Sequence, residues 1–177
     1  WHESLRPTSL EAVVIVVMKF GGTSVKDADA IRRVAGIVLR EASRTGPPVV
    51  VVSAMSGVTD QLLAAVAAAE AGDGDAASSH VWTIRDRHRA AVAALVPGSA
   101  ADAVLDPLEQ GWRDTAALLH AMSVLREVSP RSRDAVVAMG EVASSRLVAA
   151  ALPHLGVPAT WVDARTVLVT DDTFGTA

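Results

Sequence analysis

The 177-residue sequence contains no cysteine, which excludes disulfide bonds, thiolate metal sites and cysteine nucleophiles. Basic residues are too few to attract nucleic acid in general, because 16 Lys and Arg face 20 Asp and Glu and leave a formal net charge of −4. The five histidines show no HxH or HxxxH spacing, so we predict no metal site.

Long hydrophobic runs are missing as well. The longest, residues 12–18, is too short to span a bilayer, and Lys19 and two glycines follow it where a signal peptide would have its cleavage site. We therefore expect no membrane partner and a cytoplasmic protein. Half of the residues are nevertheless hydrophobic, which supplies enough apolar material for a folded core.

Two continuous apolar, β-branched runs alternate with helical patterns. Residues 12–20 and 49–52 predict parallel strands covered on both faces, and a helix over 27–43, with Asp27 as its N-cap, separates them. This order is typical of parallel strands with right-handed crossovers. Further predicted elements are helices near 59–71, 78–96, 100–128 and 132–152, a third strand at 159–163 and an extended stretch at 167–169.

Polar residues follow each predicted strand, at the carboxyl end where ligands bind in open α/β sheets. We expect three groups to share one rim of the sheet: residues 19–24, Ser53 and Asp163.

The first group could cradle a phosphoryl group. Gly21 and Gly22 allow the backbone to approach a ligand, a helix N-terminus nearby adds positive potential, and Lys19 supplies a charge. Thr23 and Ser24 supply hydroxyls. The lysine precedes the glycines, so the segment is not a Walker A loop. An ordinary strand-to-helix turn with an exposed lysine is the alternative.

Two further segments carry candidate ligand-binding groups. Residues 53–60 are small and hydroxyl-rich, although taken alone they are better explained by helix capping at Thr59 or Asp60. Glu141 lies in an otherwise small and apolar segment, so its carboxylate is either exposed on a helix or buried and paired. The charged run 85–89 is interpreted as a solvated helix face with local ion pairs.

The segment KFGGTSV at 19–25 closely resembles the N-terminal signature of aspartate kinases. Further resemblances follow in the same order: VVVVSAMSGVTDQLL at 49–63, MGE at 139–141, VDAR at 162–165 and TDDTFGTA at 170–177. The resemblance covers 13–177 and implies the amino acid kinase fold, a three-layer α/β/α arrangement with a mainly parallel sheet. Residues 12–177 would be its incomplete N-terminal, aspartate-binding portion, preceded by a loose leader at 1–11.

The resemblance also implies an activity: transfer of the ATP γ-phosphate to the β-carboxylate of L-aspartate, with Mg²⁺. The product, 4-phospho-L-aspartate, begins lysine, threonine and methionine synthesis. Lys19 would be the catalytic cation, and residues 21–24 would bind phosphate. The positions that match substrate-binding residues of the family are Ser53, Thr59, Glu141, Phe174 and Gly175.

The family's nucleotide-binding half, with its Gly-rich Ser-Asp loop, has no counterpart after residue 177. We therefore expect a truncated aspartate kinase whose sheet has an unpaired edge and an uncovered apolar face. Such a chain should form homo-oligomers, aggregate, or need its missing half. The alternatives are a non-catalytic remnant, an aspartate- or partner-binding module, and a related amino acid kinase with another acidic substrate.

Overall fold

The computed structural model describes residues 15–171 and residue 174. The leader predicted at 1–11 lies outside these residues, as does Gly175. The elements, in chain order, are β1 (Val17–Phe20), η1 (Gly22–Val25), α1 (Ala28–Thr45), β2 (Val49–Val52), α2 (Val58–Glu70), α3 (Gly74–Leu95), α4 (Ser99–Leu125), α5 (Pro130–His154) and η2 (Ala164–Thr166).

The strands β1 and β2 form a parallel pair, with Lys19 opposite Val51. Helix α1 connects them, as the sequence predicts, and Asp27 caps it by accepting a hydrogen bond from the Ala30 amide at 2.8 Å. The parallel pairing places the carboxyl ends of β1 and β2 side by side. The loops that follow the two strands therefore begin at the same edge of the sheet.

Only one face of this sheet is covered by the described residues. Met18, Phe20, Val50 and Val52 pack against the hydrophobic core. On the other face Val17, Val49 and Val51 are 62%, 51% and 42% exposed. The expectation that both faces are covered is therefore wrong for the described part of the chain, whereas the expected uncovered apolar face is confirmed.

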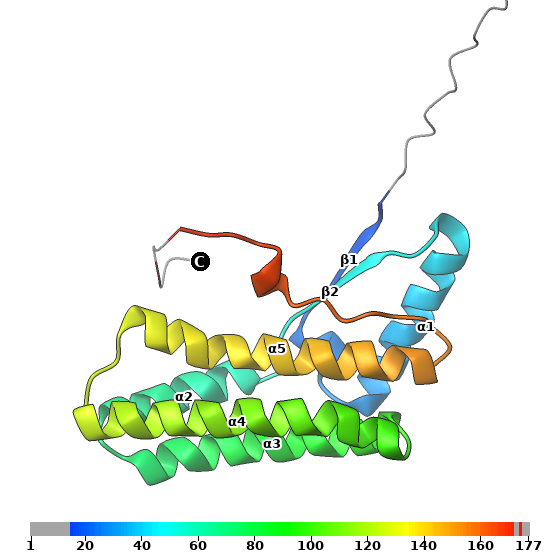
Figure 1. The fold of residues 1–177 in the computed structure, drawn as a ribbon. Helices are drawn as coiled ribbons and strands as arrows, with labels where there is room; N and C mark the ends of the chain where they lie inside the picture. Colours follow the sequence, from blue (N-terminus) through cyan, green and yellow to red (C-terminus); the bar gives the residue numbers. More distant parts are fainter. Residues whose placement is uncertain (1–14, 172–173, 175–177) are drawn as a thin grey trace, which may run out of the picture.

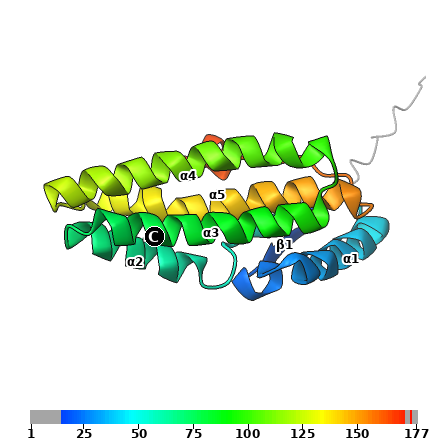
Figure 2. The ribbon, with the colours of Figure 1, turned by 90° about the horizontal axis from the view of Figure 1, so that it is seen from below.

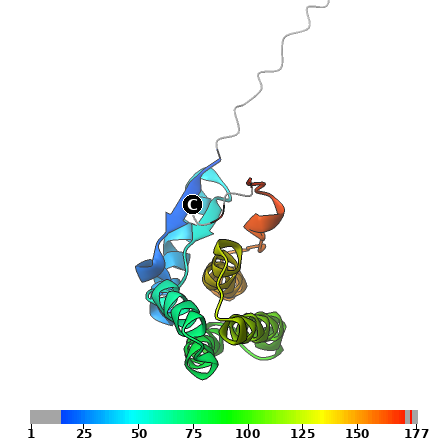
Figure 3. The ribbon, with the colours of Figure 1, turned by 90° about the vertical axis from the view of Figure 1, so that its left-hand side faces the viewer.

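Helices α2 to α5 pack as a bundle beside the sheet and α1 (Figures 1 and 2). All four were predicted, with boundaries that differ by a few residues. Figure 3 shows α5 between the strands and α4. Among the described helices, α5 is long and apolar enough to cross a membrane by length and composition alone, but half of that apolar window is buried inside the protein, as in a core helix.

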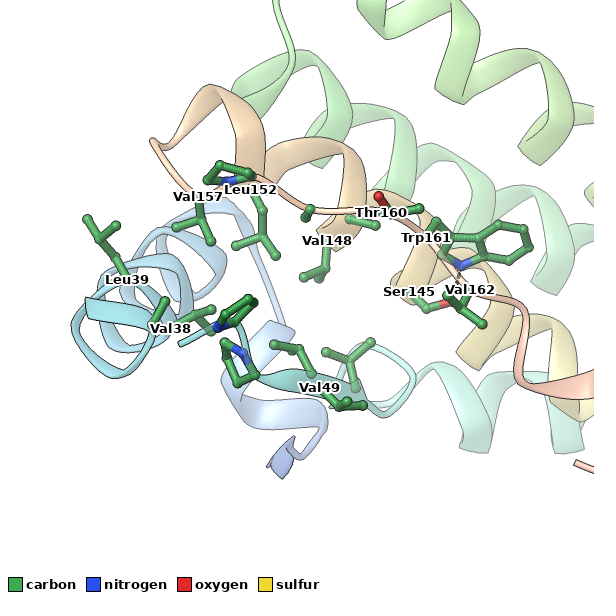
Figure 4. A pocket seen from close by; sticks show the side chains of 18 residues that line it. Val38, Leu39, Val49, Ser145, Val148, Leu152, Val157, Thr160, Trp161 and Val162 are labelled. Atoms are coloured by element: carbon green, nitrogen blue, oxygen red, sulfur yellow. Dashed lines mark hydrogen bonds between the residues drawn. The ribbon is translucent and has the colours of Figure 1, made fainter. Parts of the chain in front are cut away.

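The predicted third strand at 159–163 is wrong, because this segment has no regular secondary structure. Side chains hold it on α5 instead: the Trp161 indole donates to Ser145 Oγ at 3.0 Å, and the Arg146 guanidinium lies 3.8 Å from the centre of the Trp161 ring. A cleft of about 740 Å³ separates the segment from β2. Figure 4 shows this cleft between α1 and Trp161. Residues 167–169 are likewise irregular and exposed.

The sequence predicts a solvated helix face for the charged run 85–89, and His88 is an exception. His88 is only 1% exposed, its Nδ1 lies 2.8 Å from the Ile84 carbonyl oxygen, and its ring stands 5.3 Å from that of Trp112. Burial lowers the pKa of His88 from 6.5 to about 4, because a charged imidazolium would lose its hydration. The imidazole is therefore a neutral component of the core.

We predict that His88 makes the fold sensitive to acid. Between pH 6.5 and about 4 the unfolded chain binds a proton at this residue and the folded chain does not, so stability falls as the pH is lowered through this window. The loss should reach about 3 kcal/mol. Urea unfolding of a His88→Gln variant should show a shallower dependence on pH. His154, which is exposed, provides the control: an unchanged slope for His88→Gln, or the same change for His154→Gln, would contradict the assignment.

Candidate functional site

Two loops meet where β1 and β2 end. We call residues 21–24 the glycine loop and residues 53–57 the serine loop. The Ser53 amide donates to the Phe20 carbonyl at 3.0 Å, and the Ser56 amide donates to the Gly22 carbonyl at 3.1 Å. The backbone pairing of the sheet thus continues beyond the strands. The two segments that the sequence places on one rim are directly hydrogen-bonded.

Gly22 allows the loops to come this close. A Cβ atom at position 22 would lie 2.8 Å from the Ala54 carbonyl oxygen, closer than Cβ atoms approach other atoms, and 3.3 Å from the Ser56 nitrogen, which is a tight contact. Gly21 has no atom within 4 Å of its corresponding position. The two glycines therefore serve different purposes: Gly22 fits against the serine loop, and Gly21 leaves the backbone accessible from outside.

Helix α5 closes the site from the bundle side. A Cβ atom on Gly140 would lie 3.0 Å from Ala54 Cβ, so the helix backbone approaches the serine loop closely. Ser144 is fully buried and its hydroxyl donates to the Ser53 carbonyl at 2.7 Å. Glu141 is half-buried and stands three residues before Ser144, one turn away on the same side of the helix. Glu141 therefore lies on the same side of α5 as the residue that bonds to the serine loop.

Lys19 and Thr23 are exposed, and Ser24 is half-buried. Lys19 belongs to the same side of β1 as Val17, the uncovered face of the sheet. Helix α2 is capped by Gly57, at φ of +77°, with no side-chain cap hydrogen bond. Capping therefore does not explain Thr59, whose side chain lies in the first turn of α2, immediately after the serine loop.

The expected contribution of a helix N-terminus needs correction. The glycine loop leads into η1, a single 3-10 turn in which the Ser24 amide donates to the Gly21 carbonyl. The longer helix α1 starts only at Ala28, and Asp27 occupies its N-terminus with a carboxylate. The pKa of Asp27 is lowered, mainly because its carboxylate accepts a hydrogen bond from the Ala30 amide. A negative charge already occupies the N-terminus of α1 and makes it less suited to a second anion.

Two predicted site residues lie apart from this arrangement. Asp163 does not end a strand; it forms a 2.6 Å ion pair with Arg165, whose hydrogen bond lowers the pKa of Asp163. Phe174 contacts the beginning of α5, where the Arg131 guanidinium lies 5.6 Å from its ring centre. The hollow beside Phe174 is lined by α2 and the start of α5 and includes neither loop.

Two residues at the site were missed by sequence reasoning. The Arg87 guanidinium, from α3, donates to the Ser56 carbonyl at 3.0 Å, but in the sequence it is one charge in a charged run. Ser144 is easier to find from the sequence than Arg87, because its three-residue spacing from Glu141 predicts that both lie on the same side of a helix. These two residues show that the bundle contacts the serine loop through side chains of α3 and α5.

Comparisons with known proteins point to one family. The family described as the amino acid kinase family matches residues 14–174. A chloroplastic bifunctional aspartokinase/homoserine dehydrogenase 1 of Arabidopsis thaliana is 35% identical over 153 residues, which are 86% of this chain and 16% of that protein. Lysine-sensitive aspartokinase 3 of Escherichia coli is 34% identical over 167 residues, 92% of this chain and 34% of that protein.

Solved structures show the same likeness. The chain superposes on E. coli aspartokinase III in complex with aspartate and ADP, the R-state, with a TM-score of 0.79 and 34% identity over 92% of this chain. The T-state complex with lysine and aspartate gives a TM-score of 0.75. The chain spans about a third of the length of these E. coli proteins. Its helices and small parallel sheet match the N-terminal portion of their fold.

The close contact at Gly22 yields a stability prediction. Gly22→Ala should lower the free energy of unfolding by about 1–3 kcal/mol, because the new methyl group overpacks against the backbone of the serine loop. Gly21→Ala is the matched control and should cost less than about 1 kcal/mol, since its φ of −74° suits alanine and the space is open. Urea unfolding measures both. Equal losses for the two variants would contradict the contact.

Proposed function

Because the chain belongs to the amino acid kinase family, we propose that residues 12–177 form the N-terminal, aspartate-binding part of an aspartate kinase. The reaction is transfer of the ATP γ-phosphate to the β-carboxylate of L-aspartate, which gives 4-phospho-L-aspartate. The observation that carries this proposal is the hydrogen-bonded junction of the glycine loop, next to Lys19, with the serine loop. The aspartokinases among its relatives support the choice of substrate.

The chemistry needs cations and amides more than a nucleophilic side chain. The substrate carboxylate is itself the nucleophile, and its attack brings two anions together. Lys19 neutralises the equatorial oxygens of the transferring phosphoryl group, and the amides of Gly21 and Gly22 donate to the same oxygens. Thr23 and Ser24 add hydroxyl donors beside them. The β-carboxylate then displaces ADP, and no covalent enzyme intermediate forms.

The serine loop and α5 position the amino acid. Ser53, the first residue of the serine loop, and Thr59, just after the loop, hold the aspartate by their hydroxyl groups. Glu141, from α5 on the opposite side, binds its ammonium group. A carboxylate suits this role because an ion pair inside a half-buried site is screened less than one at the surface. Phe174 and Gly175 match the family pattern. Phe174, which lies against the beginning of α5, would join the site only by moving toward the loops.

ATP enters with its own metal ion in this proposal. Among residues 15–171 and 174, no group of three or more His, Asp or Glu side chains could hold a metal ion. Magnesium is assigned to the phosphates of ATP, as is common for nucleotides. The chain's own contribution is the cradle formed by Lys19 and the glycine loop.

The proposal extends to partners and location. The relatives are about three times as long as this chain or longer, and the exposed valines of the sheet offer an apolar surface. We assign this surface to the remaining part of the kinase or, without it, to a second copy of the chain. The pathway is amino-acid biosynthesis toward lysine, threonine and methionine, and the compartment is the cytoplasm.

The catalytic proposal is tested by trapping the acyl phosphate with hydroxylamine in the presence of ATP, Mg²⁺ and L-aspartate. In the full-length product of the gene, Lys19→Ala should lower kcat by at least about 100-fold, because charge stabilisation of the transition state is lost. Lys26→Ala is the control, since Lys26 is exposed, its Nζ lies 3.8 Å from the Asp27 carboxylate and it is assigned no role in the reaction.

Two outcomes count against the proposal. Full activity of Lys19→Ala would remove the lysine from the reaction. Absence of any hydroxamate from the wild-type product, combined with aspartate binding by calorimetry, would favour a second function: an aspartate-binding module without phosphoryl transfer.

The apolar sheet face generates a prediction about association. The 177-residue chain alone should form dimers or larger species in analytical ultracentrifugation, and the double substitution Val49→Thr, Val51→Thr should weaken the association because it makes this face polar at constant shape. Val124→Thr on α4, where Val124 is 69% exposed, is the control. A monomeric wild-type chain would contradict the prediction.

A further inference from the structure

Four hydrogen bonds fix the serine loop from two opposite sides. On one side the amides of Ser53 and Ser56 donate to the carbonyls of Phe20 and Gly22. On the other side the carbonyls of the same two serines accept from side chains of the bundle. We propose that these two bundle residues, Arg87 and Ser144, are positioning residues that hold the serine loop against the glycine loop.

Ser144 fixes the start of the loop. Its side chain is completely buried, and its hydroxyl oxygen lies 2.7 Å from the Ser53 carbonyl oxygen and 3.2 Å from that of Glu141. A hydroxyl has one proton to donate, and the shorter distance assigns it to Ser53. This bond spans 91 residues of sequence, so it ties the loop to α5 and not to its own neighbours. The same turn of α5 carries Glu141.

Arg87 fixes the end of the loop. Its guanidinium donates to the Ser56 carbonyl at 3.0 Å from α3, 31 residues away. A hydrogen bond from a charged donor is stronger than a neutral one, and its partner residue also donates its amide to Gly22. The next residue, Gly57, turns the chain into α2 at a positive φ. Arg87 therefore controls the point at which the serine loop becomes the helix that carries Thr59.

The bonds of Arg87 and Ser144 are to main-chain atoms, so these residues act through the loop. The positioning of the loop is independent of the proposed function, whereas the expected effect on aspartate binding rests on it. Loosening the loop would separate Ser53 and Thr59 from the phosphoryl cradle, and aspartate would bind more weakly before chemistry begins. A residue that only stabilised the bundle would not change the affinity for aspartate selectively.

The geometric part is tested by amide hydrogen exchange on the 177-residue chain. In Arg87→Gln and Ser144→Ala, the amides of Ser53 and Ser56 should exchange about tenfold faster, because a hydrogen-bonded anchor is lost next to them. Amides in the middle of α4 should keep their rates. Unchanged exchange in the serine loop would overturn the proposal. Faster exchange throughout the bundle would also overturn it, because the effect would then be global destabilisation.

The matched controls come from the same helices. Arg85→Gln removes a guanidinium that pairs with the adjacent Asp86, and Ser145→Ala removes the hydroxyl that accepts from Trp161. Neither substitution should change exchange in the serine loop. An equal response to these controls would show that any loss from α3 or α5 loosens the loop, and it would overturn a specific role.

The functional part uses the full-length gene product. Arg87→Gln should raise KM for L-aspartate about tenfold and change kcat by less than about threefold, and Arg87→Lys should recover part of the loss because it retains a cationic donor. A lower kcat with unchanged KM would overturn the link to substrate affinity. If the wild-type product does not phosphorylate aspartate, the proposed function fails, and hydrogen exchange alone decides whether Arg87 and Ser144 position the loop.

Discussion

The absence of a side chain at position 22 is the constraint on which the site depends. With hydrogen at this position, the glycine loop reaches within hydrogen-bonding distance of the serine loop, and the backbone pairing of β1 and β2 continues into both loops. A methyl group would force the loops apart at the point where the proposed reaction brings two anions together. Because the protein interior tolerates little overlap, this one contact determines how far the proposed phosphate site lies from the proposed amino-acid site.

The helical bundle extends the same constraint to α5. Gly140 plays the same part as Gly22, because the missing side chain lets the backbone of α5 approach Ala54 closely. On the same helix, the Ser144 hydroxyl donates to the Ser53 carbonyl. The buried core of α2 to α5 thus serves as a rigid support for a loop of five residues. The charged groups proposed for binding and catalysis can remain partly exposed, because the support does not require them to be buried.

Much of the fold could be predicted from the sequence because its signals are local. The helices follow from 3.6-residue periodicity, α1 begins after Asp27 as its capping chemistry requires, and the parallel order of β1 and β2 follows from the intervening helix. The glycine and serine loops could be placed on one rim for the same reason. Glu141 could be selected because a carboxylate in an apolar segment is unusual.

The errors concern tertiary partners. Residues 159–163 have the composition of a strand, but a strand also needs a neighbouring ladder, and Trp161 bonds to Ser145 of α5 instead. The sequence run 85–89 is charged on average, yet its members have different environments: His88 is buried beside Trp112, and Arg87 reaches the serine loop. Periodicity does not reveal which helix face meets a loop 31 residues away, so Arg87 could not be assigned from the sequence.

The central claim is that aspartate binds at the junction of the glycine and serine loops, on the side that α5 borders. A crystal structure of the full-length gene product with L-aspartate and ADP tests this claim most directly. The account predicts the β-carboxylate near Lys19, with the ammonium group near Glu141 and the amino acid contacting Ser53 and Thr59. Aspartate bound instead in the cleft between β2 and residues 157–162, or with its β-carboxylate turned away from Lys19, would contradict the account.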